Sequence, residues 1–513
     1  MTNTPSLRLS PGSVSLRELR SFHLEGASAA LSEDVFERVL AAHRQVEAIT
    51  AGQDAVYGIN TGFGLLARER IPNERLRELQ RNLILSHSTG TGDELDAETT
   101  RLVVLLKLIG LGRGHSGVRP VVLERLQELL DRGLLPCIPA KGSVGASGDL
   151  APLAHLTATL LGEGELRRDD KRRPAAEFLK AEGIPLLVLG PKEGLALING
   201  TQVSTALALS ALLKAERVFA AAVVCGALSI EAAKGSSRPF DPRIHLARGQ
   251  EGQIDVARAY ARLLGDSEIR RSHAHCGRVQ DPYSLRCQPQ VMGASLDSLR
   301  HGAKILRIEA NAATDNPLLF PEDDAVLSGG NFHAEPVAQV ADLLAVAIAE
   351  IGAISERRIA LLVDPNTSGL PAFLVKDGGV NSGFMIAHVT AAALASENKS
   401  LAHPSSVDSI PTSANQEDHV SMATYGARRL HEMIENVATI VGIELLAAAQ
   451  GIGFHRPLRS SERLERFVAL LREHVAPYEQ DRFFAPDIEA AKSLVLSGAF
   501  VSETEELLPS YQA

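Results

Sequence analysis

A twelve-residue run, GSVGASGDLAPL at positions 142–153, carries the residue types needed to make an electrophile from the main chain itself. It contains a small residue, a serine that can lose water, and a glycine, in the order Ala146-Ser147-Gly148. Attack of the Gly148 nitrogen on the Ala146 carbonyl carbon, with dehydration of Ser147, would give a ring that bears an exocyclic methylene. Glycine suits the attacking position because it tolerates a compressed turn and a close approach.

Two other interpretations of this run are a flexible loop and a phosphate-binding loop. A phosphate loop of the GxxxxGK[ST] kind needs a lysine followed by serine or threonine after its glycines. No such pair follows here, and the carboxylate of Asp149 would repel a phosphate. The composition of the run therefore favours the ring over a phosphate cradle, while a flexible loop stays open for an isolated Ala-Ser-Gly.

The run resembles the signature of ammonia-lyases that use a 4-methylideneimidazol-5-one (MIO) group, the MIO-dependent aromatic amino acid ammonia-lyases. Five more blocks carry the same resemblance: YGINTGFG (57–64), EGLALINGTQ (193–202), QDPYSLRCQPQVMG (280–293), SGGNFHAEP (328–336) and SANQEDHVSM (413–422). The six blocks extend over roughly the first four-fifths of the chain. The resemblance implies that Ala146, Ser147 and Gly148 form the MIO group, so that no external cofactor is needed.

Elimination of ammonia from an amino acid presents two chemical problems. The amine is a poor leaving group, which an electrophile that captures its lone pair would correct. The β-proton is weakly acidic and needs a base, for which the resembled family uses tyrosines and a glutamate. The resemblance places Tyr57 first as that base, ahead of Glu417, and the sequence leaves the choice between them open.

The resemblance also implies roles in substrate binding, residue by residue. We expect Arg286 to hold the substrate carboxylate through two hydrogen bonds, as guanidinium groups do. The remaining expected contributors are Tyr283, which assists near the ring, Asn199, which binds carboxylate and orients the ring, Gln280, which adds hydrogen bonds, and Phe332, which lines the pocket.

His87 and Glu417 bear on which amino acid is the substrate. A carboxylate such as Glu417 can accept a hydrogen bond from an imidazole N–H, whereas an apolar pocket end would suit phenylalanine. We therefore expect L-histidine as substrate and trans-urocanate and ammonia as products. A tyrosine or phenylalanine ammonia-lyase, or an MIO-dependent aminomutase, is the alternative, because His87 could also bond a phenol.

More distant interpretations lack support from the motifs. A helical lyase of the fumarase type would form no ring, and a purely structural helical scaffold would need no motif of this kind. His273, His275 and Cys276 form His-x-His-Cys, but no second cluster at zinc-like spacing accompanies them, so we expect no metal. No Gly-x-Ser-x-Gly nucleophile elbow occurs either.

Composition and charge narrow the class of protein further. The chain has 513 residues, a net charge of -10, 45% hydrophobic residues and no tryptophan. The negative charge argues against nucleic-acid binding. Four cysteines give no disulfide framework, the N-terminus has no apolar signal region, and the apolar stretch 218–230 is too short to cross a bilayer. We expect a soluble cytoplasmic protein with no membrane partner.

The elements that must position these residues are predicted to be helices. A capping box, Ser15-Leu16-Arg17-Glu18, begins the first helix, and a second follows Ser32. Further helices are predicted over 76–87 and 98–111, with irregular loop over 134–151. Long apolar helices are predicted over 195–234, 291–312, 334–362, 384–401 and 420–450.

The predicted fold is mainly α, with an N-terminal helix-and-loop domain that carries the MIO loop (1–191). A central bundle of long helices follows (192–460), and a C-terminal helical segment closes it (461–513), with Asp487 as an N-cap. We expect a short strand over 184–189 and a solvated loop over 167–173. The resemblance further implies a homotetramer whose active sites are shared between subunits.

Overall fold

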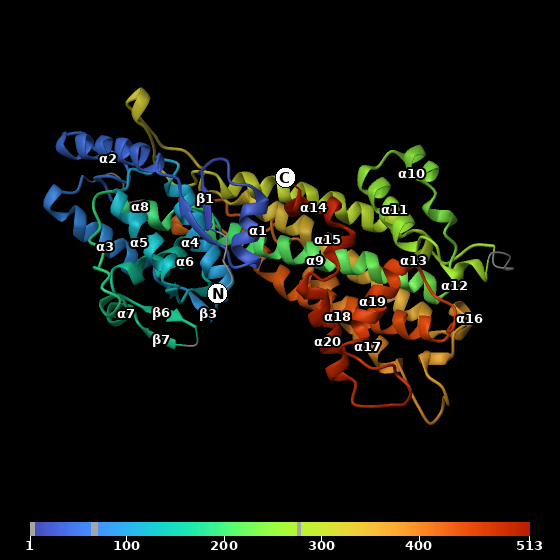
Figure 1. Ribbon diagram of the computed structural model, residues 1–513. Helices are drawn as coiled ribbons and strands as arrows, with labels where there is room; N and C mark the ends of the chain where they lie inside the picture. The colour runs from blue at the N-terminus through green and yellow to red at the C-terminus, as the bar shows by residue number, and fades with distance from the viewer. Residues whose placement is uncertain (1–5, 63–69, 170, 274–278, 513) are drawn as a thin grey trace.

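Four long helices form the centre of the molecule. The computed structural model describes residues 6–62, 70–169, 171–273 and 279–512. Within it, the bundle consists of α9 (Gln202–Ala232), α14 (Gln288–Ala310), α15 (Glu335–Val363) and α18 (Ala423–Gly453), seen side by side in Figure 1. The most extensive contacts between elements join α18 to α9 and α15. The predicted mainly-α fold with a long central bundle is confirmed.

The bundle forms because these helices are apolar on nearly every side. Almost every residue of α9 is buried, including the stretch 218–230. A helix of this kind must be surrounded by other helices. By length and composition alone, α15 and α18 could each cross a membrane, but 67% and 78% of their most apolar windows are buried inside the fold. Here that apolar surface packs against neighbouring helices.

The N-terminal part consists of shorter helices around the start of α9. The predicted capping box is confirmed: the Glu18 amide donates to the Ser15 hydroxyl, and the Ser15 amide donates to the Glu18 carboxylate. The helices of this part are α1 (Leu16–Leu24), α2 (Val35–Ala51), α3 (Leu76–His87), α4 (Ala97–Leu111), α5 (Pro120–Asp131), α6 (Leu150–Leu160), α7 (Ala175–Ala181) and α8 (Glu193–Ile198).

Further helices extend and cover the bundle on its C-terminal side. They are α10 (Pro242–Arg248), α11 (Glu251–Leu264), α12 (Glu268–Arg271), α13 (Tyr283–Arg286), α16 (Pro365–Ser368), α17 (Met385–Leu401), α19 (Glu462–Arg472) and α20 (Ala485–Ser497). The main hydrophobic core contains buried residues from most of these elements, the first being Leu9 and the last Leu508. The three-part domain division stays a prediction.

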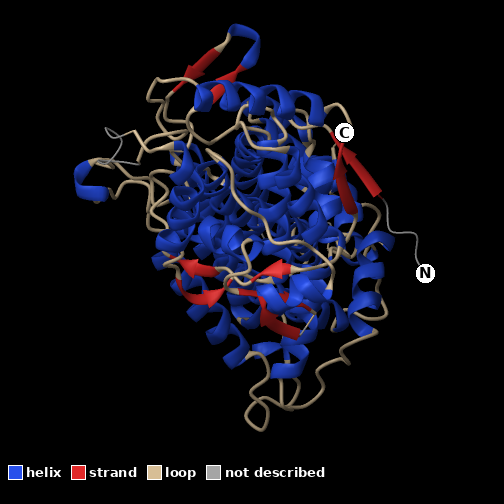
Figure 2. Cartoon of the chain, turned by 90° about the vertical axis from the view of Figure 1, so that its left-hand side faces the viewer, coloured by secondary structure: helices blue, strands red, loops and turns tan. Residues whose placement is uncertain are grey.

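The strands are short and lie at the outside of the helical body (Figure 2). β1 (Ser6–Leu9) pairs in parallel with β2 (Ser28–Leu31), while the other pairs are antiparallel. These others are β3 (Thr91–Glu94) with β5 (Pro139–Lys141), β6 (Glu165–Arg168) with β4 (Leu135–Pro136) and β7 (Lys171–Pro174), and β8 (Leu318–Phe320) with β9 (Ala325–Leu327).

Two predictions about strands were wrong. Residues 184–189 form no strand, and 167–173 contributes to two paired strands rather than a loop, with Arg168 opposite Lys171. Asp169, directly after Arg168, has a φ of 53°, a conformation that aspartate tolerates better than most residues. The segment 134–151 is loop for most of its length but contributes β4 and β5.

Two predictions about helices also need correction. The helix predicted over 195–234 is interrupted at residues 199–201, where Asn199 is extended and Gly200 has a φ of 132°. Asp487 is not an N-cap: α20 begins at Ala485, and Asp487 lies in its first turn. There its carboxylate accepts from Arg482 Nε at 2.8 Å, and an acidic group in the first turn is favourable to the helix dipole.

Candidate active site

The Ala146-Ser147-Gly148 segment lies against the break between α8 and α9. Gly148 and Gly200 form an isolated parallel bridge, and the Asp149 amide donates to the Gly200 carbonyl at 2.8 Å. Gly148 has a φ of 73°, and a Cβ there would lie 2.3 Å from the Gly200 oxygen. Position 148 therefore has room for glycine only, which is the residue that the proposed ring closure requires.

Asn199 connects this break to Ser147. Its amide Nδ2 donates to the Ser147 carbonyl oxygen at 2.7 Å, and its side chain is buried. Among the described residues, the Asn199 Oδ1 atom has no hydrogen-bond partner. A buried amide oxygen without a partner is costly unless a ligand supplies a donor.

Asp149 is a further functional candidate, although its sequence position indicated only a charge that would repel phosphate. Its fully buried carboxylate accepts from Ser143 Oγ at 2.9 Å and Thr424 Oγ1 at 2.6 Å. It also accepts from the Ser204 amide and hydroxyl at 2.8 and 2.9 Å. These bonds tie the loop to α9 and α18. An acidic residue directly after the glycine-rich run was the available signal.

Glu417 reaches the same segment from a distant part of the chain. Its carboxylate accepts from the Ser147 hydroxyl, from Thr412 Oγ1 at 2.6 Å and from Ser413 Oγ at 2.8 Å. The loop that presents it contains three consecutive residues with left-handed φ values, Ser413 (50°), Ala414 (52°) and Asn415 (66°). Strained backbone of this kind is concentrated at functional sites.

The electrostatics of Glu417 and His87 are coupled. Burial raises the pKa of Glu417, but hydrogen bonds from Ser147, Thr412 and Ser413, with the attraction of His87, hold it below the ordinary value. Burial lowers the pKa of His87, only partly offset by a backbone hydrogen bond and the charge of Glu417. At neutral pH the pair is therefore a carboxylate beside a neutral imidazole.

The blocks 328–336 and 413–422 meet above the glycine-rich run. The Ala334 amide and the Ser421 hydroxyl donate to the Gly145 carbonyl at 3.1 and 2.9 Å. His333 Nε2 lies 3.2 Å from the His419 carbonyl oxygen. Phe332, two residues before Ala334, is half-buried at this edge.

Tyr57 directly precedes a glycine that packs against α8, the helix whose C-cap is Asn199. A Cβ at the adjacent Gly58 would meet the Leu195 side chain of α8 at 2.8 Å and Pro317 at 2.9 Å. Tyr57 is half-buried and packs against the main core. The end of its motif block, residues 63 and 64, lies outside the described residues, as do His275 and Cys276 of the His-x-His-Cys pattern.

Three predicted site residues lie at the other end of α9. Asp281, between Gln280 and α13, accepts from the Ser236 amide at 2.7 Å, just beyond the last turn of α9. Since Ser204 near the first turn of α9 contacts Asp149, the 31 residues of this helix separate the two groups by about 45 Å. Figure 1 shows α13 far from α6 and α8.

The side chains at this far end are open to the surroundings. Tyr283 is 71% exposed, and the Arg286 guanidinium carbon lies 4.6 Å from the centre of its ring. Gln280 is exposed as well, and the buried Arg286 Nε has no hydrogen-bond partner among the described residues. One chain therefore does not bring Gln280, Tyr283 or Arg286 to Ser147.

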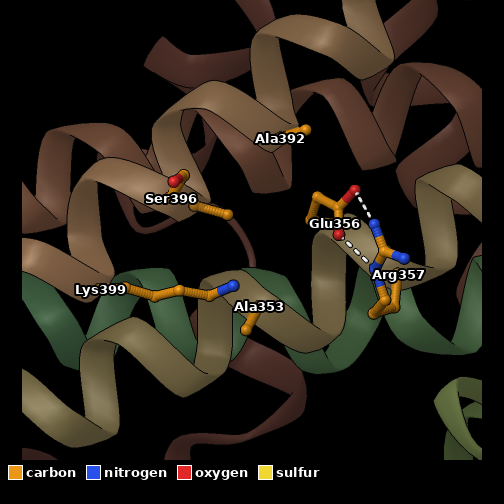
Figure 3. A pocket seen from close by; sticks show the side chains of 7 residues that line it. Ala353, Glu356, Arg357, Ala392, Ser396 and Lys399 are labelled. Atoms are coloured by element: carbon orange, nitrogen blue, oxygen red, sulfur yellow. Dashed lines mark hydrogen bonds and ion pairs between the residues drawn. The ribbon is translucent and has the colours of Figure 1, made fainter.

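Two hollows at the surface lie away from Ser147. One, of about 360 Å³, lies between α15 and α17 and is lined by Glu356, Arg357 and Lys399 among others (Figure 3). The other, of about 650 Å³, is lined by residues such as Arg456, Arg472 and Tyr478. Neither includes any predicted site residue, so in the described part of one chain neither provides a pocket around Ser147.

The residues present fit an MIO ring. A glycine that admits no Cβ stands where the ring nitrogen would be, and Ser147 is held at its carbonyl by Asn199 and at its hydroxyl by Glu417. The arrangement can bind and polarise a group formed at Ser147 and can accept a proton beside it.

Comparisons with known proteins agree with this geometry. Residues 14–473 match the family model of the aromatic amino acid lyases. The histidine ammonia-lyase of Paracidovorax citrulli is 59% identical over 512 residues, with 100% of each chain covered.

Two solved structures extend the likeness to the fold. The crystal structure of histidine ammonia-lyase from Trypanosoma cruzi has a TM-score of 0.90 and 42% identity, covering 99% of this chain and 97% of its own. A tyrosine aminomutase from Streptomyces globisporus has a TM-score of 0.92 and 35% identity, covering 98% and 99%. The chain belongs to the aromatic amino acid lyase family.

Proposed function

We propose that this protein eliminates ammonia from L-histidine and releases trans-urocanate. Relatives with the name histidine ammonia-lyase are 56–59% identical to it over nearly their whole length, which bears out the function predicted from the sequence. The observation that carries the proposal is the position of Ser147 between the Asn199 amide and the Glu417 carboxylate. It explains how one segment could be both held and activated.

We infer that the MIO group is made from Ala146-Ser147-Gly148 without an external cofactor. The Gly148 nitrogen bonds to the Ala146 carbonyl carbon, whose oxygen leaves as water. Ser147 loses its α-hydrogen and hydroxyl as a second water. The ring, once formed, supplies an electrophilic methylene carbon that captures the substrate amine. The Gly148–Gly200 contact supports this assignment, because it keeps Gly148 in the left-handed turn.

Asn199 and Glu417 are assigned to the reacting end of the site. The Asn199 amide binds the Ser147 carbonyl, and its unpartnered Oδ1 can accept from an N–H of the substrate. The Glu417 carboxylate stays charged at neutral pH and can accept from the imidazole of histidine or take a proton. His87, neutral beside it, would complete the polar end of the pocket.

Removal of the β-proton is assigned to Tyr57 first and to Glu417 second. As the Cα–N bond breaks, the base accepts the β-proton while the electrons form the Cα–Cβ double bond of urocanate. Tyr57 is supported by the packing of the adjacent Gly58 against α8, the helix whose C-cap is Asn199. Glu417 is supported by its hydrogen bond with Ser147.

A second copy of the chain is proposed to complete the site. Gln280, Tyr283 and Arg286 would come from a neighbouring subunit of a homotetramer, where Arg286 would bind the substrate carboxylate. The exposure of Tyr283 and the length of α9 support this arrangement. Phe332 would line the pocket from the same side as Ala334. We also propose a cytoplasmic location and no nucleic-acid or membrane partner, in line with the charge and composition.

The alternative activities differ in the substrate rather than in the ring. A tyrosine or phenylalanine lyase, or an aminomutase, would use the same electrophile, and a tyrosine aminomutase is among the similar structures. The polar pair His87–Glu417 favours an imidazole. Purified protein should be assayed with histidine, tyrosine and phenylalanine under one set of conditions. We expect urocanate to form fastest, and fast coumarate formation without urocanate would overturn the proposal.

A further inference from the structure

A fully buried lysine contacts the main chain at the break between α8 and α9, next to the Ser147 segment. Lys107 lies in α4, and its side chain is 1% exposed. Its side-chain nitrogen Nζ donates to the carbonyl oxygens of Ala196 and Asn199, each at 3.0 Å. Neither the sequence motifs nor the roles assigned above use this residue.

The two carbonyls lie at the end of α8, and this end needs a partner. The last carbonyls of a helix have no N–H donor within the helix, so a donor from another element must satisfy them. α8 has six residues, so few internal hydrogen bonds define where it stops. Lys107 ties both carbonyls to one nitrogen, and this contact fixes the point at which the chain leaves α8.

The contacts then continue directly to Ser147. The carbonyl of Asn199 receives Lys107, while its side-chain amide donates to the Ser147 carbonyl at 2.7 Å. The next residue, Gly200, accepts from the Asp149 amide at 2.8 Å. Lys107 therefore contacts the residue that makes the first of these hydrogen bonds and the neighbour of the residue that accepts the second.

A second buried lysine shows that Lys107 is not a simple ion-pair partner. Lys192 Nζ lies 2.8 Å from Asp315 Oδ2 and 2.8 Å from the Ser116 carbonyl. Within the described ranges, Lys107 has no carboxylate at that distance, and Asp315, Asp149 and Lys192 act on it only through longer-range charge. Its printed hydrogen bonds go to two main-chain oxygens. These two hydrogen bonds suit a side chain whose role is to hold the main chain in place.

We propose that Lys107 is a positioning residue for the reaction: it holds the α8–α9 break so that the Asn199 amide stays on the Ser147 carbonyl. The inference rests on the proposed ammonia-lyase function. It assigns to Lys107 no contact with substrate, so its loss should lower turnover by misplacing Asn199 rather than by weakening binding. A displacement of about 1 Å at such a position lowers rates by roughly 100-fold.

A double-mutant cycle with Asn199 tests this assignment. We would measure urocanate formation in Lys107→Met, Asn199→Ala and the double variant, with Lys107→Gln as a milder change that keeps one donor group. We expect kcat to fall roughly 100-fold in Lys107→Met and less in Lys107→Gln, with KM changed by less than about threefold. The double variant should be no slower than Asn199→Ala alone, because Lys107 acts through Asn199.

Two further readouts separate positioning from loss of stability. Intact mass should show the loss of two waters in Lys107→Met, as in the parent protein. The control is Leu105→Ala, which shortens another buried side chain of α4. If it lowers Tm by as much as Lys107→Met does, it should still keep the kcat of the parent protein. If Lys107→Met does not fold, Lys107→Gln carries the same cycle.

Several results would overturn the inference. Losses that multiply in the double variant, a Leu105→Ala variant as slow as Lys107→Met, or a Lys107→Met chain without dehydration would each contradict it. If the parent protein forms urocanate and Lys107→Met does so equally fast, the inference alone fails. If the parent protein forms none from histidine, the proposed function fails first.

Discussion

The two ends of α9 differ in how far one chain completes them. At the first turn, the Ser147 segment is enclosed: Asp149 accepts four hydrogen bonds, and Ser147 is held by Asn199 and Glu417. Beyond the last turn, Tyr283 is 71% exposed and the buried Arg286 Nε lacks a partner among the described residues. Both ends belong to the sequence blocks that carry the family resemblance.

This difference separates two requirements of the site. Ring closure needs a rigid, preformed environment, and one chain supplies it through buried donors and glycines that admit no side chain. Substrate binding needs groups that can meet the ring from outside, and in the proposed homotetramer the far end of α9 would offer such groups to another subunit. A helix of about 45 Å keeps the two sets apart within one chain.

The largest effect is expected at the enclosed end. Ser147→Ala should lower urocanate formation by more than about 1,000-fold, which corresponds to roughly 4 kcal/mol of activation free energy, because no methylene can form. The fold should persist, with Tm close to that of the parent protein. Ser298→Ala, at a half-buried position on α14 outside the predicted site, is the control and should keep full activity. Full activity in Ser147→Ala would exclude a role for Ser147.

Glu417→Gln should give the next largest loss, about 100-fold in kcat, because the amide cannot accept a proton.

The low pKa of Glu417 also predicts a pH effect on stability. Its stabilising contribution is complete above the ordinary value near 4.5 and is lost as pH falls through the lower folded value. Thermal denaturation from pH 3 to 7 should therefore show a smaller acid-induced decrease in Glu417→Gln than in the parent. An equal decrease in both would refute this.

At the open end, Arg286→Met should lower kcat/KM about 10- to 100-fold through the loss of charged hydrogen bonds to the substrate carboxylate.

Coexpression of Arg286→Met chains with Ser147→Ala chains tests whether the two ends of α9 belong to one site. If sites are shared, mixed oligomers should regain activity at roughly a quarter of their sites. Activity of the mixture no higher than that of the separate variants would mean that each chain uses its own Arg286. Mixed Arg286→Met and Arg286→Ala chains serve as the control and should regain nothing.

The titration of Lys107 tests whether water is excluded from the enclosed end of α9. Burial lowers its pKa from 10.5 to about 7, with Asp315 and Asp149 opposing this and Lys192 adding to it. Between these values the unfolded chain holds the proton and the folded chain does not. The free energy of unfolding should therefore rise with pH across this window, by at most a few kcal/mol. Denaturant titrations at pH 7 to 10 should show this rise in the parent and its absence in Lys107→Met.

The smallest effect is expected in the strained loop that presents Glu417. Ala414 has a φ of 52°, which glycine adopts without penalty. Ala414→Gly should raise the free energy of unfolding by about 0.5–1 kcal/mol. Ala402→Gly, in a right-handed helical cap, should lower it instead and is the matched control. A loss of stability in Ala414→Gly would show that the loop is not strained there.

The sequence predicted well whatever depends on local pattern. The helices after Ser15 and over 76–87, and the long apolar helices of the bundle, follow from capping residues and periodicity. The break at Asn199 was missed although the polar run 199–202 (NGTQ) interrupts the apolar pattern and its Asn-Gly pair is typical of a turn. The apolar residues on both sides were taken as one helix, and the bridge between Gly200 and Gly148 appears only in the folded chain. The paired strands within 167–173 were missed because their charged residues resemble a loop.

For the site, motifs indicated which residues matter but not how they meet. Ser147, Asn199 and Glu417 were predicted and lie together. Asp149 and Lys107 gave weak signals, because a buried charge looks the same in sequence as an exposed one. Two of their partners, Thr424 for Asp149 and the Asn199 carbonyl for Lys107, lie 275 and 92 positions away in the chain. Only the folded chain reveals such pairings.

The most direct test of the central claim is the mass of the peptide that contains residues 142–153, isolated from active protein. We predict that it is lighter by two water molecules than its sequence requires, and that the same peptide from Ser147→Ala does not show this double loss. An unmodified peptide from fully active protein would contradict the account.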